Sequence, residues 1–365
     1  MEQNTSGSGK KALIAMSGGV DSSVAAFLVK NEGYDCIGIT MKLFEGEGAE
    51  TGRGRSCCSL DDVKDAENAA AVLGIAHYVN NFSGDFKKNV IDTFVESYIK
   101  GTTPNPCIDC NRYLKFDRLL LRAKELGMDY IATGHYAIIE KDSDSDLFIL
   151  KKAKDLKKDQ SYFLYSMTQE QLSHTLFPLG SLEKNEVRII AEKLGFKNAH
   201  KEESQDICFV PNGNYGEFIE RYTGQLSPEG NYIDLENNIL GKHKGIIRYT
   251  IGQRRGINIS LNKPMYVHSK NIIDNTVTLS EDKDLFRKSL QAGDFNWISG
   301  KPPSGSIRAR VKIRYNQSEQ WAEIKMAENN TVYIEFDKPQ RAIAAGQAAV
   351  IYDGDTVLGG GTILC

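Results

Sequence analysis

Residues 12–23 read Ala-Leu-Ile-Ala-Met-Ser-Gly-Gly-Val-Asp-Ser-Ser, and this stretch decides how the first part of the chain folds. The apolar run 12–16 predicts a buried strand, Ser-Gly-Gly predicts a tight turn, and residues 22–31 predict a helix. A strand, a glycine turn and a helix start in this order aim backbone N–H groups and a helix dipole at phosphate oxygens. The stretch therefore predicts a phosphate-binding loop, with a plain tight turn as the alternative.

The chemistry of this loop differs from that of a GxxxxGK[ST] phosphate loop, because no lysine follows its glycines. Gly18 and Gly19 let a ligand approach the backbone without a Cβ in the way, and Asp21 could hold a magnesium ion. The motif SGGVDS resembles the pyrophosphate loop of enzymes that split ATP into AMP and pyrophosphate. Such enzymes usually adenylate a carbonyl oxygen, so we expect ATP and Mg²⁺ as cofactors.

The composition narrows the class of protein. A chain of 365 residues is too long for one typical core, so two or three domains are expected. No apolar run approaches the length of a membrane span, and we expect no membrane partner. Seven cysteines, an odd number spread over a long chain, favour a cytoplasmic protein with reactive or metal-binding thiols over a disulfide framework. The net charge of −3 predicts no overall attraction to nucleic acid, so any such binding needs local basic patches.

Strand and helix patterns alternate up to about residue 140. The expected strands are 12–16, 36–42, 77–80 and 130–133, and the expected helices are 22–31, 60–73, 86–99 and 112–126. This alternation predicts a Rossmann-like α/β domain with a parallel sheet and helices on both faces. Ligands then bind at the carboxyl ends of the strands, where Gly134-His135 also falls.

The rest of the chain changes character twice. A hairpin (138–140 with 148–151) and two helices (168–175 and 184–193) precede a Gly- and Asn-rich region from about 215 to 285. Strand-like runs at 306–315, 319–326, 331–336, 348–352 and 357–363 then predict a small β-barrel. We expect a disordered N-terminus over 1–11, a catalytic domain over 12–214, a small central domain over 215–285 and a barrel over 286–365.

The segment Thr103-Pro104-Asn105-Pro106-Cys107-Ile108-Asp109-Cys110 is made rigid by its two prolines and leads into a helix. We expect Cys110 at or just before the helix start, where the dipole lowers the pKa of a thiol. Cys208 is expected on a loop or strand edge. A lone CxxC is compatible with a zinc half-site, a redox pair or part of an iron–sulfur site, and inert buried thiols are the alternative. Because no second CxxC exists, a four-cysteine structural zinc site is disfavoured. The pair Cys57-Cys58 is assigned no role.

Two basic features could bind an acidic partner. In the expected strand 307–314, the four cations Arg308, Arg310, Lys312 and Arg314 alternate with apolar residues and would line one face, as a phosphate track. Its alternative is a solvated outer face of the barrel. Lysines concentrated between 151 and 158, together with Arg254 and Arg255, are the other candidates.

Taken together, the motifs resemble those of one family, the bacterial tRNA-specific 2-thiouridylases. They span residues 17–361 in the family's order: SGGVDSS, TPNPCIDCNRYLKF, DYIATGHY, KDQSYFLY, ICF, YTIGQRRG, GQAAVIYDG and LGGG. The resemblance implies an adenine nucleotide alpha hydrolase-like domain that adenylates the C2 carbonyl of the wobble uridine of tRNA. A cysteine persulfide then delivers sulfur, and AMP leaves. A cysteine desulfurase, acting directly or through a relay, is implied as the sulfur donor.

The resemblance also implies the roles of individual residues. Cys208 would carry the persulfide, and Cys110 would attack it and leave a Cys110–Cys208 disulfide. ATP would be surrounded by Ala15, Met16, Ser17, Gly18, Gly19, Val20, Asp21 and Ser22, with Met41 and Gly134. The target base would meet Asn105, Pro106 and Cys107. Further tRNA contacts would be His135, Lys158, Asp159, Gln160, Arg314, Tyr315 and Gln347.

One residue departs from the family pattern. Many members carry an aspartate, proposed to act as an acid or base, where this chain has Cys107. The substitution raises the alternative that Cys107, Cys110 and Cys208 together hold a [4Fe–4S] cluster that binds sulfide. Two other classes remain open: a pyrophosphate-loop ligase for small molecules, which leaves the cysteines unused, and a non-catalytic RNA-binding or iron–sulfur assembly protein, which leaves the ATP loop unused.

Overall fold

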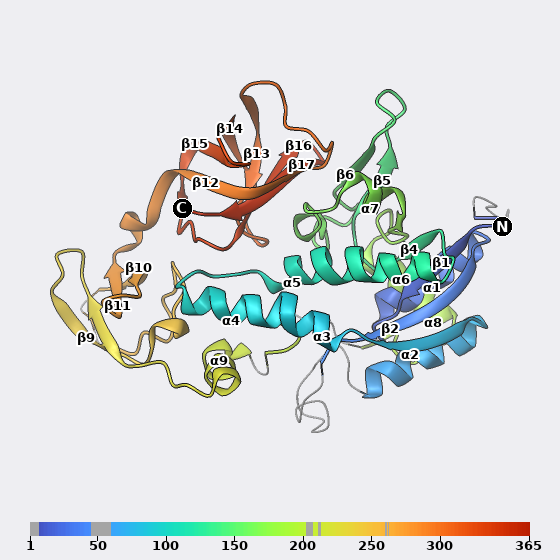
Figure 1. The fold of residues 1–365 in the computed structure, drawn as a ribbon, viewed down its shortest axis with the longest axis horizontal. Helices are drawn as coiled ribbons and strands as arrows, with labels where there is room; N and C mark the ends of the chain where they lie inside the picture. Colours follow the sequence, from blue (N-terminus) through green and yellow to red (C-terminus); the bar gives the residue numbers. More distant parts are fainter. Residues whose placement is uncertain (1–6, 45–59, 202–206, 211–212, 260, 262) are drawn as a thin grey trace.

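The apolar run that precedes Ser17 forms a strand, β1 (Lys11–Ala15), whose three central residues, Ala12, Leu13 and Ile14, are entirely inaccessible. The computed structural model describes residues 7–44, 60–201, 207–210, 213–259, 261 and 263–365 (Figure 1). Residues 7–10 form a turn before β1, so the described part of the expected disordered segment 1–11 is structured.

In the described residues the first sheet has five parallel strands in the order β3-β2-β1-β4-β7. Its other strands are β2 (Asp35–Lys42), β3 (Ala76–Asn81), β4 (Tyr130–Ala132) and β7 (Thr175–Leu176). The strand order changes direction between β1 and β4, which is where an open parallel sheet binds its ligand. The predicted Rossmann-like domain is therefore confirmed; β7 was not predicted and occupies the end of an expected helix.

Helices cover both faces of this sheet, because successive side chains of β1 point to opposite sides. Ala12 and Ile14 pack in one core with helices α1 (Val20–Asn31), α2 (Leu60–Leu73) and α8 (Lys184–Lys193). Leu13 packs in the other core with α3 (Ser83–Phe86), α4 (Asp92–Ile99) and α6 (Leu119–Glu125). A short helix, α7 (Gln169–Ser173), begins with a capping box at Thr168.

Two helices start earlier than predicted and contain π-helical turns. A π-helical stretch at Lys87–Ile91 joins α3 to α4, and another at Cys110–Arg118 joins α5 (Pro106–Asp109) to α6. The second helix begins at Pro106 because proline suits the first helical position, where its missing N–H costs nothing. The CxxC motif therefore lies inside this helix and not before it.

The C-terminal region is a barrel, as predicted. Its strands are β12 (Phe286–Trp297), β13 (Ile307–Lys312), β14 (Gln320–Met326), β15 (Val332–Arg341), β16 (Ala348–Asp353) and β17 (Thr356–Ile363). The sheet closes through pairing of β12 with both β15 and β17. The hairpin β5 (Ile138–Lys141) and β6 (Phe148–Lys151) extends the barrel sheet through β17, so the catalytic domain contributes two strands to it.

The central region consists of helix α9 (Tyr215–Thr223) and a small sheet in the order β10-β11-β8-β9. These strands are β8 (Gly230–Ile233), β9 (Ile239–His243), β10 (Tyr266–Asn271) and β11 (Thr276–Ser280). In Figure 1 this sheet lies beyond the end of α4, below the barrel. None of the helices in the described ranges is long and apolar enough to span a membrane.

Candidate functional site

The loop between β1 and α1 lies at the switch point of the sheet, and its shape depends on Gly18. This residue has φ +77°, and a Cβ on it would lie 2.1 Å from the carbonyl oxygen of Asp62 in α2. Any side chain would therefore be strained and would collide with backbone. Gly19, at φ −84°, meets nothing closer than 3.5 Å, so its absent side chain leaves open space beside the loop.

Hydroxyl groups hold the loop in this conformation. The Ser22 Oγ donates to the Gly19 carbonyl at 2.9 Å and accepts from the Ser17 backbone N–H at 3.2 Å. The Asn198 Nδ2 donates to the Gly18 carbonyl at 2.9 Å and to the Ser23 Oγ at 3.0 Å. No pattern in the sequence indicates Asn198, which reaches the loop from a segment 180 residues away. Met16 and Met41 are both buried, in the two different cores of the domain.

Asp21 does not stand open to a metal ion in this arrangement. The Lys184 Nζ binds both of its carboxylate oxygens, at 2.7 and 2.8 Å, and the Tyr136 hydroxyl donates to Oδ1 at 2.8 Å. Mg²⁺ bound at Asp21 would compete with Lys184 for the same carboxylate oxygens. The prediction named Asp21 as a magnesium ligand without seeing this buried lysine.

The Gly134-His135 turn follows β4 and packs against the start of α1. A Cβ on Gly134 would lie 2.8 Å from the backbone of Asp21 and Ser22, so this position requires glycine for close packing. His135 is 8% exposed, and its Nδ1 is 2.7 Å from the Thr133 Oγ1. Burial, with Lys115 nearby, keeps the pKa of His135 well below its usual value, so the ring is neutral. His135 was expected to contact tRNA, but its burial favours a supporting position.

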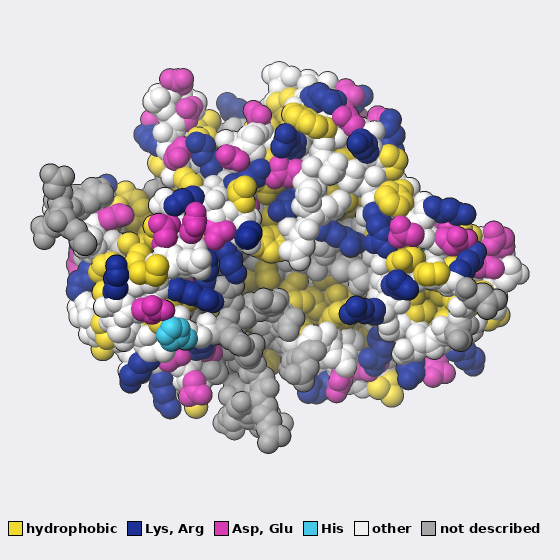
Figure 2. All heavy atoms as spheres, turned by 180° about the vertical axis from the view of Figure 1, so that it is seen from behind, with side chains coloured by type: hydrophobic (Ala, Val, Ile, Leu, Met, Phe, Trp, Pro, Cys, Tyr) yellow, Lys and Arg dark blue, Asp and Glu magenta, His cyan; other side chains and the backbone are white. Residues whose placement is uncertain are grey.

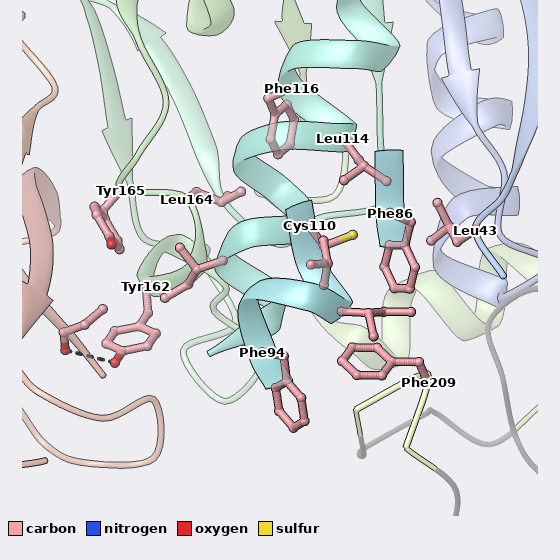
Figure 3. Close-up of a cluster of buried hydrophobic side chains, with 14 of the residues drawn as sticks. Leu43, Phe86, Phe94, Cys110, Leu114, Phe116, Tyr162, Leu164, Tyr165 and Phe209 are labelled. Carbon is pink, nitrogen blue, oxygen red and sulfur yellow. Dashed lines mark hydrogen bonds between the residues drawn. The ribbon is translucent and has the colours of Figure 1, made fainter. Parts of the chain in front are cut away.

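The CxxC segment is placed differently from the prediction. Cys110 is 9% exposed and is the first residue of the π-helical stretch, so the dipole of a helix start does not act on it. Cys107 occupies the first helical turn instead and is exposed. Figure 3 shows the Cys110 side chain among buried side chains that include Phe86 and Leu114.

Cys208 lies in a turn beside the same core. Its neighbour Phe209 stacks edge-on against Phe86 and Phe94, with ring centroids 5.6 and 5.2 Å apart. Cys208 itself is half-buried and packs against the cluster that contains Cys110. The fold thus brings two of the predicted sulfur residues to one cluster. Cys57 and Cys58 lie outside the described residues.

The arrangement does not fit a cluster held by three cysteines. Among the residues with described positions, no three His, Cys, Asp or Glu side chains are grouped so as to hold a metal ion. Cys107 is exposed on the first turn, whereas Cys110 is buried one turn later. We therefore derive no step through an iron–sulfur cluster.

Comparison with known proteins covers nearly the whole chain. Residues 10–212 match the tRNA methyl transferase HUP domain family, residues 216–281 the tRNA methyl transferase PRC-barrel domain, and residues 287–363 the aminomethyltransferase beta-barrel domain. The tRNA-specific 2-thiouridylase MnmA of Clostridioides difficile (strain 630) is 49% identical over 97% of this chain and 98% of its own. The MnmA of Caldicellulosiruptor saccharolyticus is 52% identical over 97% of this chain and 98% of its own.

The chain belongs to the tRNA-specific 2-thiouridylase family. The family resemblance drawn from the motifs is thereby confirmed. Among solved structures, a 4-thiouridine synthetase–RNA complex with bound ATP covers 58% of this chain and 50% of its own, at 16% identity and a TM-score of 0.35. That value is too low for any conclusion about this thiouridylase-family chain.

The triplet 158–160 of this thiouridylase-family chain is tied to the loop through Tyr136. The Tyr136 N–H donates to the Gln160 Oε1 at 3.0 Å, and the Gln160 N–H donates back to the Tyr136 carbonyl at 2.8 Å. Asp159 is buried and accepts hydrogen bonds from Ala153 and Ser161. Lys158 is half-buried. Asp159 was expected to face tRNA, but its contacts are those of a residue that shapes this turn.

Gln347, Arg314 and Tyr315 each contact a segment outside the barrel. The Gln347 Nε2 donates to the carbonyl oxygens of Thr103 and Pro104, at 2.8 and 3.4 Å, just before Asn105 and Pro106. The Arg314 guanidinium donates to the carbonyls of Ile251 and Ala342. Tyr315 packs on Phe163 with ring centroids 4.5 Å apart.

The predicted cationic strand keeps its alternation, with Ala309, Val311 and Ile313 buried. Its charges are not equivalent. Arg308 and Arg310 both lie over the Trp321 ring, and Arg308 is in addition paired with Asp337. On the face shown in Figure 2, Lys and Arg side chains are interspersed with Asp and Glu. The side of the molecule drawn in Figure 2 therefore presents no continuous basic patch.

Proposed function

We propose that this protein catalyses the ATP-dependent 2-thiolation of the wobble uridine of tRNA. The observation that carries the proposal is the identity of about half of all residues to curated tRNA-specific 2-thiouridylases over 97% of the chain. Two features support it physically: a glycine loop at the sheet's switch point, and two cysteines in segments that pack in one cluster. ATP use follows from the loop, and tRNA is the substrate.

The first step is adenylation. ATP binds with its phosphates at the loop formed by residues 15–22, and Met41 and Gly134 complete the nucleotide site. The C2 carbonyl oxygen of the uridine attacks the α-phosphorus, and pyrophosphate leaves. This converts a poor oxide leaving group into AMP, which is a good one. Bound Mg²⁺ would neutralise phosphate charge, and at Asp21 it would compete with Lys184.

The second step is sulfur transfer. The terminal sulfur of a Cys208 persulfide attacks C2 and forms a C–S bond, and AMP departs with the electron pair of the C–O bond. The Cys110 thiolate then attacks the Cys208 Sγ, so that the S–S bond to the base breaks and its electrons stay on the base sulfur. The products are 2-thiouridine and a Cys110–Cys208 disulfide. A thiol reductant and a cysteine desulfurase, acting directly or through a relay, recharge the enzyme.

The substrate is held from two sides. The target base meets the 105–107 segment, where the exposed Cys107 stands in place of an acid–base aspartate. The barrel, with Arg310 and the Arg314–Tyr315 pair, takes the tRNA backbone. A protein with this chemistry and this use of cysteine works in the cytoplasm.

One assay separates the proposal from its rivals. AMP and pyrophosphate should form only when tRNA is present, and sulfur from a loaded Cys208 should appear in that tRNA. Pyrophosphate release without tRNA would identify a ligase for small molecules, and no release at all would identify a non-catalytic protein. Anaerobic purification with iron and sulfide analysis tests the cluster alternative. Stoichiometric iron that is required for thiolation would overturn the persulfide route.

A further inference from the structure

Arg314, just beyond β13, carries a positive charge at the junction of the barrel and the central domain. Its Nη2 donates to the carbonyl oxygens of Ile251, in the central domain, and Ala342, in the barrel, at 3.1 and 2.7 Å. In the described parts of the chain no carboxylate pairs with Arg314, and its Nε and Nη1 groups make no hydrogen bond. Carbonyl oxygens satisfy the N–H groups of a guanidinium but do not neutralise its charge. Among these residues the charge of Arg314 therefore has no matching anion.

A second guanidinium reaches the same place. Arg341, the last residue of β15, donates from its Nε to the Asp282 Oδ1 at 2.8 Å and lies over the Tyr266 ring, 5.0 Å from the centroid. These contacts fix the plane of the guanidinium and engage its Nε edge. A Cβ on Gly252 would lie 3.3 Å from the Arg341 Nη1 and 3.8 Å from the Arg314 Nη2. The two guanidiniums therefore meet at Gly252, where the central domain contacts the barrel.

Bringing these cations together costs free energy. Burial, and after it the charge of Arg341, lower the pKa of Arg314, so the folded protein disfavours this cation. Asp282 matches only one of the two charges. Arg254 and Arg255, exposed on the neighbouring turn of the central domain, add further positive charge. An anion that accepts hydrogen bonds from two guanidiniums would offset the cost, and the oxygens of a phosphate suit that geometry.

We propose that Arg341 and Arg314 together bind one phosphate of the tRNA backbone at the junction of the barrel and the central domain. Arg314 donates from its Nε and Nη1, and Arg341 donates from its Nη groups. The exposed arginines beside the pair favour a polyanion over an isolated phosphate ion. This inference rests on the proposed function because it takes tRNA as the substrate. It adds Arg341, which none of the sequence motifs indicates.

The test measures binding of unmodified tRNA to the whole protein over a range of salt concentrations. We expect Arg341→Gln to weaken binding at least about fivefold, because charge-assisted hydrogen bonds are lost. The slope of log K against log salt should fall by about 1, as for one phosphate contact. Lys338→Gln is the matched control, since it removes the same charge from an exposed position of the same strand. It should weaken binding less than about twofold and leave the slope unchanged.

A second variant separates phosphate binding from a purely structural ion pair. Asp282→Asn removes the charge that pairs with Arg341 but keeps the guanidinium. It should bind tRNA at least as tightly as the unaltered protein, because a carboxylate no longer competes with the phosphate. Equal weakening by Asp282→Asn and Arg341→Gln would mean that the pair only holds the barrel to the central domain. An unchanged salt slope in Arg341→Gln would mean that no phosphate binds there. Either result overturns the inference.

Inorganic phosphate distinguishes a site for tRNA from a site for a small anion. At constant ionic strength it should raise the melting temperatures of the unaltered protein and of Arg341→Gln equally. If it stabilises only the unaltered protein while both bind tRNA equally well, the site takes a small anion and the inference is wrong. Failure of the unaltered protein to bind tRNA would instead contradict the proposed function.

Discussion

Gln347 and Thr103 are 244 residues apart in the chain and are joined by a hydrogen bond of 2.8 Å from the Gln347 Nε2 to the Thr103 carbonyl oxygen. The Thr103 N–H also donates to the Ala345 carbonyl at 2.8 Å, and Gly346, at φ +89°, lies directly against the Thr103 backbone. A loop of the barrel therefore holds the segment that leads into the Cys107–Cys110 helix. The C-terminal domain therefore supports the helix that carries Cys107 and Cys110.

We predict from this contact that Gln347→Ala acts mainly on turnover. Loss of one hydrogen bond, worth about 1 kcal/mol, should lower kcat for thiolation about fivefold, because the segment carrying Cys110 loosens. The KM for tRNA should change less than the kcat does. A rise in KM with an unchanged kcat would show instead that Gln347 contacts tRNA directly. Alkylation of Cys110 by iodoacetamide should also become faster in the variant.

The two loop glycines should respond differently to the same substitution. Gly18→Ala should destabilise the protein by about 2–4 kcal/mol and abolish ATP binding, since its Cβ meets backbone in a left-handed conformation. Gly19→Ala should fold normally, as nothing lies within 3.5 Å of its Cβ, and should weaken only nucleotide binding. Urea denaturation and calorimetry measure the two effects. Equal stability of the two variants would show that the loop is not built as described.

The salt dependence of tRNA binding should separate two neighbouring arginines. Arg310→Ala should weaken binding and reduce the slope of log K against log salt by about 1, because one phosphate contact is lost. Arg308→Ala should have the smaller effect, since Asp337 already matches that charge. Filter binding over a range of salt concentrations measures both slopes. If Arg310→Ala leaves the slope unchanged, the strand is only a solvated face of the barrel.

Asp109 should make stability depend on pH. Burial raises its pKa to about 7; the neighbouring Arg112 lowers the pKa and Asp294 raises it. The folded protein thus holds a proton that the unfolded chain releases near pH 4, so this contribution to stability is complete in acid and is lost as the pH rises through 7.

The corresponding experiment uses Asp109→Asn. The free energy of unfolding of the variant, relative to that of the unaltered protein, should rise by about 2 kcal/mol from pH 5 to pH 8. The reason is that the variant no longer buries a charge at the higher pH. Urea denaturation at the two pH values gives the difference. Asp144→Asn, at an exposed hairpin tip, is the control and should show no such gain. The same stability difference at both pH values would contradict the account.

The sequence predicted what depends on local patterns. Apolar residues in alternating and in helical spacing identified the parallel sheet and the barrel. Ser-Gly-Gly after an apolar strand identified the loop. Relationships between distant residues were not predictable in this way. Lys184 beside Asp21, Asn198 on Gly18 and the pairing of β6 with β17 join segments that no periodicity connects. The error over Cys110 was local: the helix starts at Pro106, before the expected start at 112, and so moves the cysteine into the core.

The central claim is that sulfur passes from Cys208 to tRNA with closure of a Cys110–Cys208 disulfide. A single turnover tests it most directly: protein loaded with a Cys208 persulfide is mixed with ATP and unmodified tRNA without reductant, and tRNA and protein are analysed by mass spectrometry. The account predicts one 2-thiouridine for each new Cys110–Cys208 disulfide. Thiolated tRNA formed while Cys110 remains a thiol, or a disulfide that includes Cys107 instead, would contradict it.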